Sequence, residues 1–317
     1  MGNIKVDQMF DFFICPECRT SSLQKREGTV FCADKACRKF EEPFNMVNSK
    51  PVLIDFNHSL SSEQSFKSYS GKSIVPRRTS SVVHILRAIF VGKSKKSIQN
   101  FDYLKKEMLK LNNPRILIVG GGELGSGMDD FYSVLKENIV TFDIYDSVNV
   151  QFVADAHMIP FRNDIFDLII IQAVLEHVLD PHKVVSEITR VLKLQGIVYA
   201  ETPFMQQVHE GPYDFTRFTE SGHRFLFKNY TLISSGYISG VGSALLWSLD
   251  FFFSGLLRTR YAGKAIRMLF FWLRFVDTIV PDSYNIDGAC GVYLIGRKSE
   301  TSMKEYEIVP YYQGNQK

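Results

Sequence analysis

The sequence predicts an α/β protein with a mostly parallel sheet and helices on both faces. From residue 114 onward, short apolar runs that suit strands buried on both sides alternate with segments that suit helices. Such alternation is typical of parallel strands joined by crossover helices. Ligands of these sheets bind beyond the carboxyl ends of the strands, so we expect a site at that edge.

The first strand of this region ends in a glycine-rich turn. Ile116 to Val119 is an aliphatic run, and Gly120, Gly122 and Gly125 then give the pattern G-x-G-x-x-G before a helix that we expect to start near Ser126 or Gly127. Without Cβ atoms, the turn lets the backbone approach a ligand. The pattern indicates a nucleotide or nucleoside site, although such turns also serve tight packing alone.

Two acidic residues follow later strands. Asp143 ends the run Ile139 to Phe142, at a suitable distance from the glycines to accept hydrogen bonds from both hydroxyls of a ribose. This arrangement serves NAD and S-adenosylmethionine equally well. Asp155 follows a third strand, Val150 to Ala154, and a fourth strand covers Phe166 to Ile171.

From about residue 114 to 240 the chain resembles the class I S-adenosylmethionine-dependent methyltransferases, in the group related to ubiquinone and menaquinone methyltransferases (the methyltransferase type 11 group). The matching segments include Leu-Glu-His at 175–177, Asp180-Pro181 and Arg-Val-Leu-Lys at 190–193. The resemblance implies a Rossmann-like, seven-stranded sheet whose last strand, near Val292 to Gly296, is antiparallel. One departure is that Ile118 and Val119 replace an acidic residue that often precedes the first glycine.

The resemblance also implies roles for the residues at the strand ends. The glycines would face the methionine part of the cofactor, Asp143 its ribose and Asp155 its adenine. The predicted cofactor-binding residues are Gly120, Gly121, Gly122, Gly125, Asp143, Asp155, Ala156 and Gln172.

Composition sets broad limits. The chain has 317 residues, long enough for a full α/β domain and a smaller module, and 45% of them are hydrophobic. A net charge of +3 gives no argument for nucleic acid, and we expect no DNA partner. The amino-terminal residues show no secretory signal, which predicts a cytoplasmic protein.

Four of the five cysteines lie within the first 37 residues. Cys15 and Cys18 form one pair and Cys32 and Cys37 a second, which together suit a structural zinc ion. Disulfides are the alternative, but a reducing compartment disfavours them. Residues 40–54 resemble the end of small zinc-ribbon domains similar to the activator subunit of certain RNA and protein methyltransferases. Cys290 is predicted to be buried in a strand.

The segment that joins the two modules is basic. Residues 57–80 suit a linker, and short helices are expected at Ser81 to Val91 and Asn100 to Leu111, where they would cover the cofactor. A solvated linker explains the charge, and an anionic substrate or membrane surface is the alternative.

The acceptor side is predicted from a loop after strand five. His209 and Asp214 lie in this Pro- and Gly-containing loop, and His177 follows strand four. A nucleophile that carries a proton benefits from a base, so His209, His177 and Asp214 are the catalytic candidates. Arg217 would fix the loop or bind an anion. The loop resembles methyltransferases encoded with bacterial surface-polysaccharide and glycolipid enzymes.

About fifty residues separate the sixth and seventh strands. This insert, residues 241–285, is apolar but is interrupted by Asp250 and several basic residues, so no convincing transmembrane span results. Lys264, Arg267, Phe271 and Arg274 would share one face of a helix. Peripheral membrane contact through residues 244–280 and a buried lid or homodimer helix are both open.

The predicted function is O-methylation of a sugar or lipid-linked glycan at the inner membrane face, in polysaccharide biosynthesis. The alternatives are an RNA base methyltransferase and a non-catalytic scaffold that retains the fold. The predicted units are a zinc ribbon at 1–56, a basic linker with covering helices at 57–112, the methyltransferase domain at 113–300 and a tail at 301–317.

Overall fold

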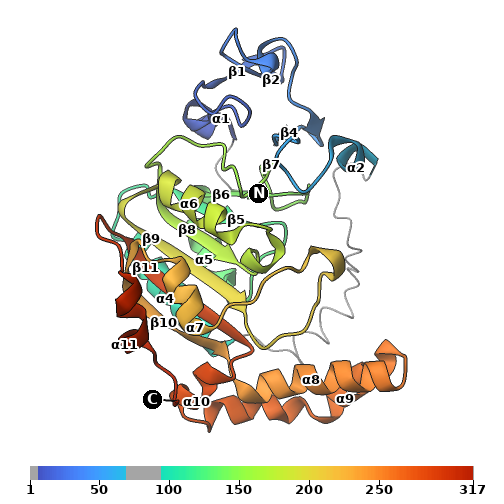
Figure 1. Ribbon diagram of the computed structural model, residues 1–317. Coiled ribbons are helices and arrows are strands. Elements are labelled where there is room, and N and C mark those ends of the chain that lie inside the picture. Colours follow the sequence, from blue (N-terminus) through green and yellow to red (C-terminus); the bar gives the residue numbers. More distant parts are fainter. Residues whose placement is uncertain (1–5, 69–93, 317) are drawn as a thin grey trace.

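The computed structural model describes residues 6–68 and 94–316 (Figure 1). The helix expected at Ser81 to Val91 lies outside the described residues. In the described part of the chain, one large sheet runs through the molecule in the order β10-β11-β9-β8-β5-β6-β7-β4-β3. Its strands are β3 (Met46–Val47), β4 (Lys50–Leu53), β5 (Ile116–Val119), β6 (Ile139–Asp143), β7 (Phe152–Ala154), β8 (Phe166–Gln172), β9 (Leu192–Pro203), β10 (Tyr230–Ser239) and β11 (Gly291–Lys298).

The pairing of the strands confirms the predicted fold class. Strands β4 to β9 are parallel to one another, whereas β11 pairs antiparallel with both β9 and β10. Every residue of β5 and of β6 is buried, as expected for strands covered on both faces. The sheet differs from the expected seven strands because β4 adds to β7 and β3 pairs with β4.

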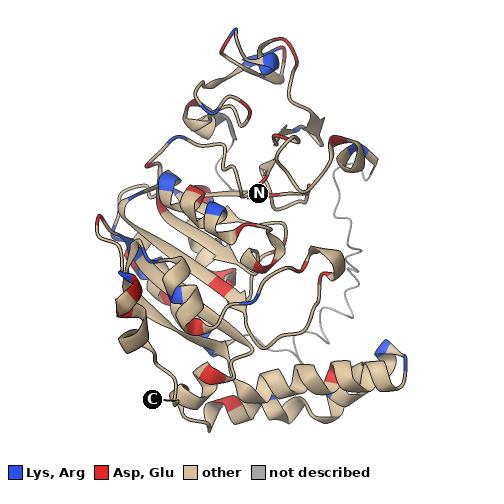
Figure 2. Cartoon of the chain, in the orientation of Figure 1, with Lys and Arg blue, Asp and Glu red and all other residues tan. Residues whose placement is uncertain are grey.

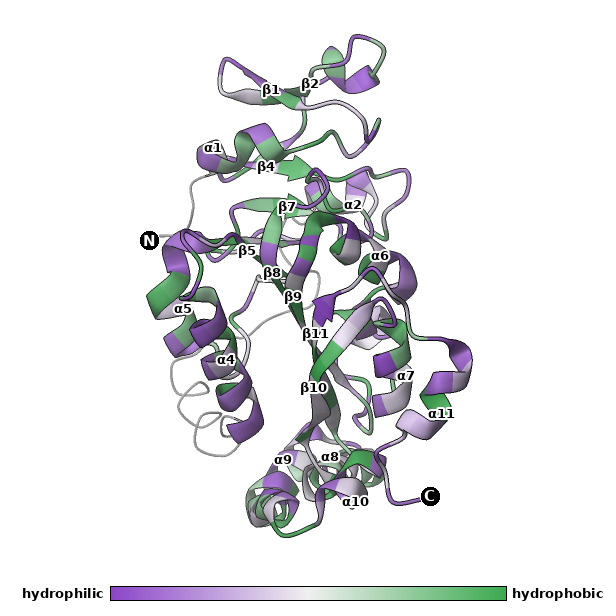
Figure 3. Ribbon diagram, turned by 90° about the vertical axis from the view of Figure 1, so that its left-hand side faces the viewer, coloured by the Kyte–Doolittle hydropathy of each residue, from purple (hydrophilic) through white to green (hydrophobic). Residues whose placement is uncertain are grey.

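Helices cover both faces of the sheet. Figure 3 shows the sheet nearly edge-on, with α4 (Lys95–Met108) and α5 (Asp129–Leu135) on one side and α6 (Pro181–Val191) and α7 (Glu220–Leu226) on the other. Side-chain acceptors at Ser94, Asp180 and Thr219 cap α4, α6 and α7 by binding free backbone N–H groups of the first turn. Short elements complete this part: η3 (Lys136–Asn138), η4 (Leu175–His177), η5 (Gly211–Tyr213), η7 (Glu305–Glu307) and α11 (Ile308–Tyr311).

Two predicted helix positions need correction. The helix after the glycine turn begins at Asp129, two to three residues later than expected, because Gly127 has a φ of 84°. The helix expected at Asn100 to Leu111 runs from Lys95 to Met108. Its buried residues include Phe101, Leu104 and Met108, whereas Leu111 is exposed beyond its end.

The amino-terminal module is built on a β-hairpin. Strands β1 (Leu23–Arg26) and β2 (Thr29–Cys32) are joined by Glu27 and Gly28, which both have positive φ values as a two-residue hairpin turn requires. The module also contains α1 (Val6–Met9), η1 (Phe10–Phe12) and η2 (Arg38–Phe40).

The module shares a core with the main sheet. The Phe13 ring stacks on Phe161 with 4.4 Å between centroids and meets Phe152 edge to face. The Ile14 N–H donates to the Pro160 carbonyl, and Phe13 and Phe161 form a β-bridge. The apolar residues of β4 are buried against the edge of the large sheet. One continuous core therefore joins the hairpin module to the sheet.

The segment after β4 is not simply a linker. Residues 63–68 form the helix α2 (Glu63–Ser68), and the Phe66 ring is buried next to Phe56. The sequence did not predict this helix within the linker segment, whose residues 57–61 form turns and bends. The sequence pattern gives no helix here because the segment has few apolar residues, and Phe66 alone buries the helix against the core.

The insert forms a helical arm at the end of the sheet that bears β10. It consists of α8 (Val241–Leu256), α9 (Arg260–Leu269), η6 (Phe271–Thr278) and α10 (Asp282–Asp287). The Asp277 carboxylate accepts hydrogen bonds from the backbone N–H groups of Gly240 and Gly242 and so fixes the start of α8. Because α9 ends at Leu269, Lys264 and Arg274 do not share one helix, and that expectation is wrong.

Candidate functional site

A cavity of about 680 Å³ opens at the carboxyl ends of the parallel strands. Residues at or just beyond the ends of β5, β6, β7, β8 and β9 line it, as the doubly wound topology predicts. Its lining includes six of the eight predicted cofactor residues and both predicted histidines: Gly120, Gly125, Asp143, Asp155, Ala156, Gln172, His177 and His209. Segments spread over more than 150 positions of sequence thus meet in one space.

The glycine turn leaves β5 in a conformation that favours glycine. Gly120 has a φ of 75°, and the N–H groups of Gly120 and Gly121 both donate to the Phe142 carbonyl. A Cβ at Gly125 would lie 1.6 Å from the Gln172 amide oxygen. Gly121 and Gly122 do not line the cavity. They lie behind it, against Thr141 and Asp143.

Asp143 ends β6 at the cavity wall, where it is nearly buried. One carboxylate oxygen accepts the N–H of Gly122 at 2.8 Å, and the other accepts the N–H of Ile144 at 2.7 Å. The backbone thus holds the carboxylate against the glycine turn.

Asp155 is held in its ionised form. Burial opposes ionisation, but hydrogen bonds from His157 and Ser59 lower the pKa of Asp155 below its usual value. The Ser59 hydroxyl donates at 2.5 Å, and the His157 ring nitrogen Nδ1 lies 2.7 Å from the other oxygen. Ser59 belongs to the segment between β4 and α2, so this segment closes the cavity beside Ala156.

Gln172 and Glu201 form a second polar wall. The Gln172 amide donates to Glu201 at 2.7 Å, and the Ser97 hydroxyl of α4 donates to the other Glu201 oxygen at 2.9 Å. Burial raises the pKa of Glu201, against the effect of these donors. The Gln172 oxygen is buried without a hydrogen-bond partner among the described residues and lies beside Gly125.

The two histidines also line the cavity and lie next to each other. Their ring centroids are 5.1 Å apart, and Glu176 lies between their outer nitrogens. Burial raises the pKa of Glu176 to about 8, and burial lowers the pKa of His177. The backbone N–H of Phe215 donates to the Glu176 carbonyl at 2.8 Å, which fixes the loop that carries His209 over η4.

Asp214 lies behind His209 and does not line the cavity. It accepts the His209 backbone N–H at 2.9 Å and forms an ion pair with Arg217. Burial opposes its ionisation, yet Arg217 and His209 lower the pKa of Asp214 to about 2. Arg217 also donates to the carbonyls of Gln206 and Gln207. Asp214 and Arg217 therefore position the loop.

Sequence reasoning missed several lining residues. Glu201 has the expected position at the end of a strand, and Glu176 is part of the Leu-Glu-His segment, so both had a sequence signal. Trp247 had none, because only the folded arm brings α8 to the cavity, with its ring centroid 6.3 Å from that of His209. Leu60 and Ser61, which follow Ser59 and line the cavity, lacked a signal for the same reason.

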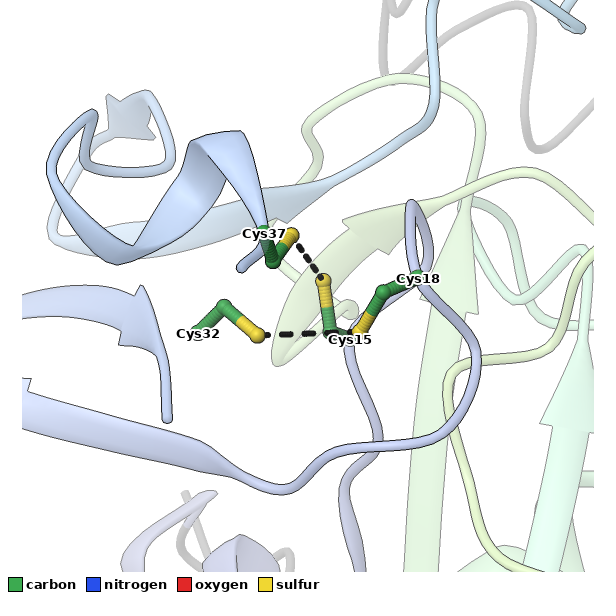
Figure 4. A group of neighbouring side chains, drawn as sticks. All are labelled: Cys15, Cys18, Cys32 and Cys37. Carbon is green, nitrogen blue, oxygen red and sulfur yellow. Dashed lines mark hydrogen bonds between the residues drawn. The ribbon is translucent and has the colours of Figure 1, made fainter. Parts of the chain in front are cut away.

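The four amino-terminal cysteines converge away from the cavity (Figure 4). The Sγ atoms of Cys15 and Cys37 are 3.9 Å apart, and those of Cys18 and Cys32 are 3.7 Å apart. These separations exclude disulfide bonds, in which the sulfurs lie about 2.05 Å apart. A tetrahedral ion with bonds of about 2.3 Å separates its ligand sulfurs by about 3.8 Å, which fits the cluster. Cys290 is buried just before β11.

Residues 123–200 match the family model described as a methyltransferase domain. No curated protein matches the chain. Among solved structures, the chain is similar at 16% identity to phosphoethanolamine N-methyltransferase 2 from Haemonchus contortus, with 71% of this chain and 59% of that chain covered and a TM-score of 0.43.

Two further structures are similar over nearly their full length. The YcgJ protein from Bacillus subtilis is 17% identical, with 64% of this chain and 99% of that chain covered and a TM-score of 0.38. A chain from a complex that contains the Trm112 methyltransferase activator of Haloferax volcanii is 16% identical, with coverages of 66% and 99% and a TM-score of 0.36. The family match confirms the predicted enzyme class, an S-adenosylmethionine-dependent methyltransferase.

Proposed function

We propose that this methyltransferase transfers a methyl group to a hydroxyl oxygen of a sugar in a glycolipid or lipid-linked glycan. The observation that carries the proposal is the continuity of the cavity, which extends from the glycine turn to the histidine pair. A donor bound at the strand ends would share this space with an acceptor that faces His177 and His209. Such shared positioning supplies a large part of the catalysis of methyl transfer.

The cofactor half suits S-adenosylmethionine, whose sulfonium supplies the methyl group. The Asp143 carboxylate lines the cavity and is the acceptor proposed for ribose hydroxyls, and Gly120 lets the backbone approach the ligand closely. The unpartnered Gln172 oxygen is a buried acceptor that a ligand N–H would satisfy. Asp155 and Ala156 remain the residues proposed for the adenine end.

The acceptor half suits an oxygen nucleophile. A hydroxyl group must lose its proton during transfer, and His209 and His177 offer ring nitrogens on the cavity wall. Asp214 acts by orienting His209. Trp247 adds a flat apolar surface beside these polar groups, as expected in a pocket for a ring-shaped ligand.

The helical arm favours an amphiphilic acceptor. Figure 2 shows that the arm is largely uncharged along α8, with basic residues at its tip, where Arg258 and Arg260 are exposed. None of the helices in the described ranges combines the length and apolarity needed to cross a membrane. Large exposed apolar side chains on the arm include Phe251, Phe252, Leu256, Leu257, Leu269, Trp272 and Phe275.

We therefore propose that the arm binds peripherally at the inner membrane face, where basic residues meet anionic headgroups. Sedimentation with vesicles of anionic and of zwitterionic phospholipid tests this. Binding to the anionic vesicles that weakens in Leu256→Ser/Leu257→Ser supports membrane contact. A concentration-dependent dimer without vesicle binding would instead assign the arm to a homodimer interface.

We further propose that the cysteine cluster holds a structural zinc ion. Four thiolates leave no open coordination position, and the cluster lies outside the cavity lining, so its role is to hold the hairpin module together.

Calorimetric titration of S-adenosylmethionine and S-adenosylhomocysteine into the full chain tests the cofactor half. Asp143→Ala is expected to weaken binding at least 10-fold, because it removes a charged acceptor, whereas the exposed Asp130→Ala serves as the control. Labelled methyl donor is then supplied with glycolipid, free glycan or RNA. Labelling of the glycolipid supports the proposal, and labelling of RNA alone overturns it in favour of a base methyltransferase.

A further inference from the structure

The Glu176 carboxylate is an unexplained group in the acceptor half of the cavity. Its residue is 1% exposed, and neither carboxylate oxygen has a hydrogen-bond partner among the described residues. A buried carboxylate without donors is costly and occurs where a proton or a cation neutralises it. The Arg217 guanidinium, whose charge acts on Glu176, already forms an ion pair with Asp214.

The two histidines present acceptor nitrogens to this carboxylate. Nδ1 of His177 lies 2.7 Å from the Tyr213 carbonyl oxygen, which only accepts, so this nitrogen carries the proton. Nδ1 of His209 lies 3.3 Å from both the Gln207 carbonyl oxygen and an Asp214 carboxylate oxygen, which gives the same tautomer. In neutral rings, both Nε2 atoms then carry lone pairs directed toward Glu176.

The distances suit three ligands of one ion. Glu176 Oε1 lies 3.6 Å from His177 Nε2 and 3.9 Å from His209 Nε2, and one ligand atom from each residue lies within 4.8 Å of the others. A tetrahedral zinc ion with bonds of about 2.0 to 2.2 Å holds its ligand atoms about 3.3 to 3.6 Å apart. The two Glu176–histidine distances would contract by a few tenths of an ångström, and the two histidine ligand atoms, at most 4.8 Å apart, would approach each other by up to about 1.5 Å.

The surroundings also resemble those of bound metals. Ligating histidines almost always donate their second ring nitrogen to a carbonyl or carboxylate, which fixes the ring and its tautomer. Both histidines do so here, to acceptors of one loop that Arg217 and Asp214 hold in place. Two nitrogens and one carboxylate oxygen form a ligand set typical of zinc sites that keep a position open.

We propose that Glu176, His177 and His209 bind one zinc ion at the acceptor end of the cavity and leave a coordination position open toward the acceptor. The site deepens the proposed function, on which the identity of the fourth ligand rests: an acceptor hydroxyl oxygen that binds there would become more acidic and would be held near the donor. With the ion bound, the two Nε2 atoms serve as ligands, and the lowered pKa of the hydroxyl takes the place of a histidine base. The ion binding itself depends only on the three residues.

Zinc content of the full chain after dialysis against buffered zinc tests the site. We expect about two ions per chain in the wild type, one for the cysteine cluster and one for this site. Glu176→Gln, which keeps the shape of the side chain, and His209→Asn are each expected to hold about one. His182→Asn, at an exposed histidine of α6, is the control and is expected to hold about two.

X-ray absorption at the zinc edge identifies the ligands. The wild type should show nitrogen and oxygen neighbours at about 2.0 to 2.2 Å together with sulfur at about 2.3 Å, and Glu176→Gln should show sulfur alone. Thermal unfolding and S-adenosylmethionine titration establish that each variant is folded. One ion per chain in the wild type, or two ions in both folded variants, would overturn the proposal. Absence of cofactor binding with two ions bound would instead reject only the proposed function.

Discussion

The two groups of potential metal ligands differ in every feature that separates structural from reactive sites. The cysteine cluster offers four sulfurs in a closed shell, between the β-hairpin and the two loops that flank it, and does not line the cavity. Glu176, His177 and His209 offer three ligand atoms from η4 and a loop, and the two histidines and Glu176 all line the cavity.

The two groups of potential metal ligands differ in how the surrounding structure holds them, and this difference predicts different roles. The cysteines are anchored through local backbone: the Cys15 N–H donates to Ser21 and the Cys37 N–H to Asp34. The histidines instead depend on a loop that a partly buried ion pair, Asp214 with Arg217, holds in place. Loss of the first cluster should affect stability, whereas loss of the second should affect turnover and leave stability nearly unchanged.

The largest effect is expected from Cys15→Ser. Cys15 is fully buried, and removal of one of four ligands opens the shell that holds the hairpin module. We expect the midpoint of thermal unfolding, measured by calorimetry, to fall by about 10 °C or more. Cys290→Ser, which removes a buried thiol outside the cluster, is the control and should lower it by much less. Equal shifts in the two variants would contradict a structural metal.

His209→Asn tests whether the second group affects turnover and not cofactor binding. Removal of the ring nitrogen is expected to lower kcat by about 10²- to 10⁴-fold, through the lost base or ligand. The dissociation constant of S-adenosylmethionine should stay within about two-fold, because His209 belongs to the proposed acceptor half and not to the proposed cofactor residues. Steady-state kinetics with the identified acceptor and calorimetry measure the two effects. Weaker binding of S-adenosylmethionine with an unchanged kcat would instead assign His209 to the cofactor half of the cavity.

His223 provides a buried titratable group that has no companion ligands. It is 1% exposed, lies between the Phe218 and Phe227 rings, and its Nε2 has no hydrogen-bond partner among the described residues. Burial lowers the pKa of His223 from 6.5 to about 3. Below pH 6.5 the histidine binds a proton in the unfolded chain but not in the folded chain. The free energy of unfolding is therefore at its full value above pH 7 and decreases as the pH falls.

The lower pKa of His223 in the folded chain should reduce the free energy of unfolding by about 2 kcal/mol between pH 7.5 and pH 5. Urea unfolding at the two pH values measures it. His223→Leu should lose less stability over this interval than the wild type, by about that amount. The same decrease in both proteins would show that His223 does not control the acid sensitivity.

The smallest effect is expected from Asp214→Asn. The amide keeps the acceptor for the His209 N–H but weakens the contact with Arg217. The loop should therefore hold the His209 ring less firmly in position. We expect kcat to fall by about 10-fold with an unchanged zinc content. Loss of activity as large as that of His209→Asn would indicate that Asp214 itself contacts the acceptor.

Much of the fold followed from local pattern. The aliphatic run Ile116 to Val119, the glycines after it and Asp143 after the next strand predicted the order of elements and the edge that carries the cavity. The sequence pattern assigns β4 to the end of the ribbon and not to the large sheet, because pairing partners distant in sequence leave no local signal. The helix α2 was missed because it is short and has a single buried aromatic residue.

The sequence by itself determined the parallel sheet, the cysteine cluster and the identity of the two histidines, since each depends on residues close together or on a regular period. Only the tertiary structure decided that Glu176 lies close to both His177 and His209, that Trp247 lines the cavity, and that Ser59 binds Asp155. The physical reason is that burial and interatomic distance are set by packing between segments far apart in the chain, and no local pattern encodes them.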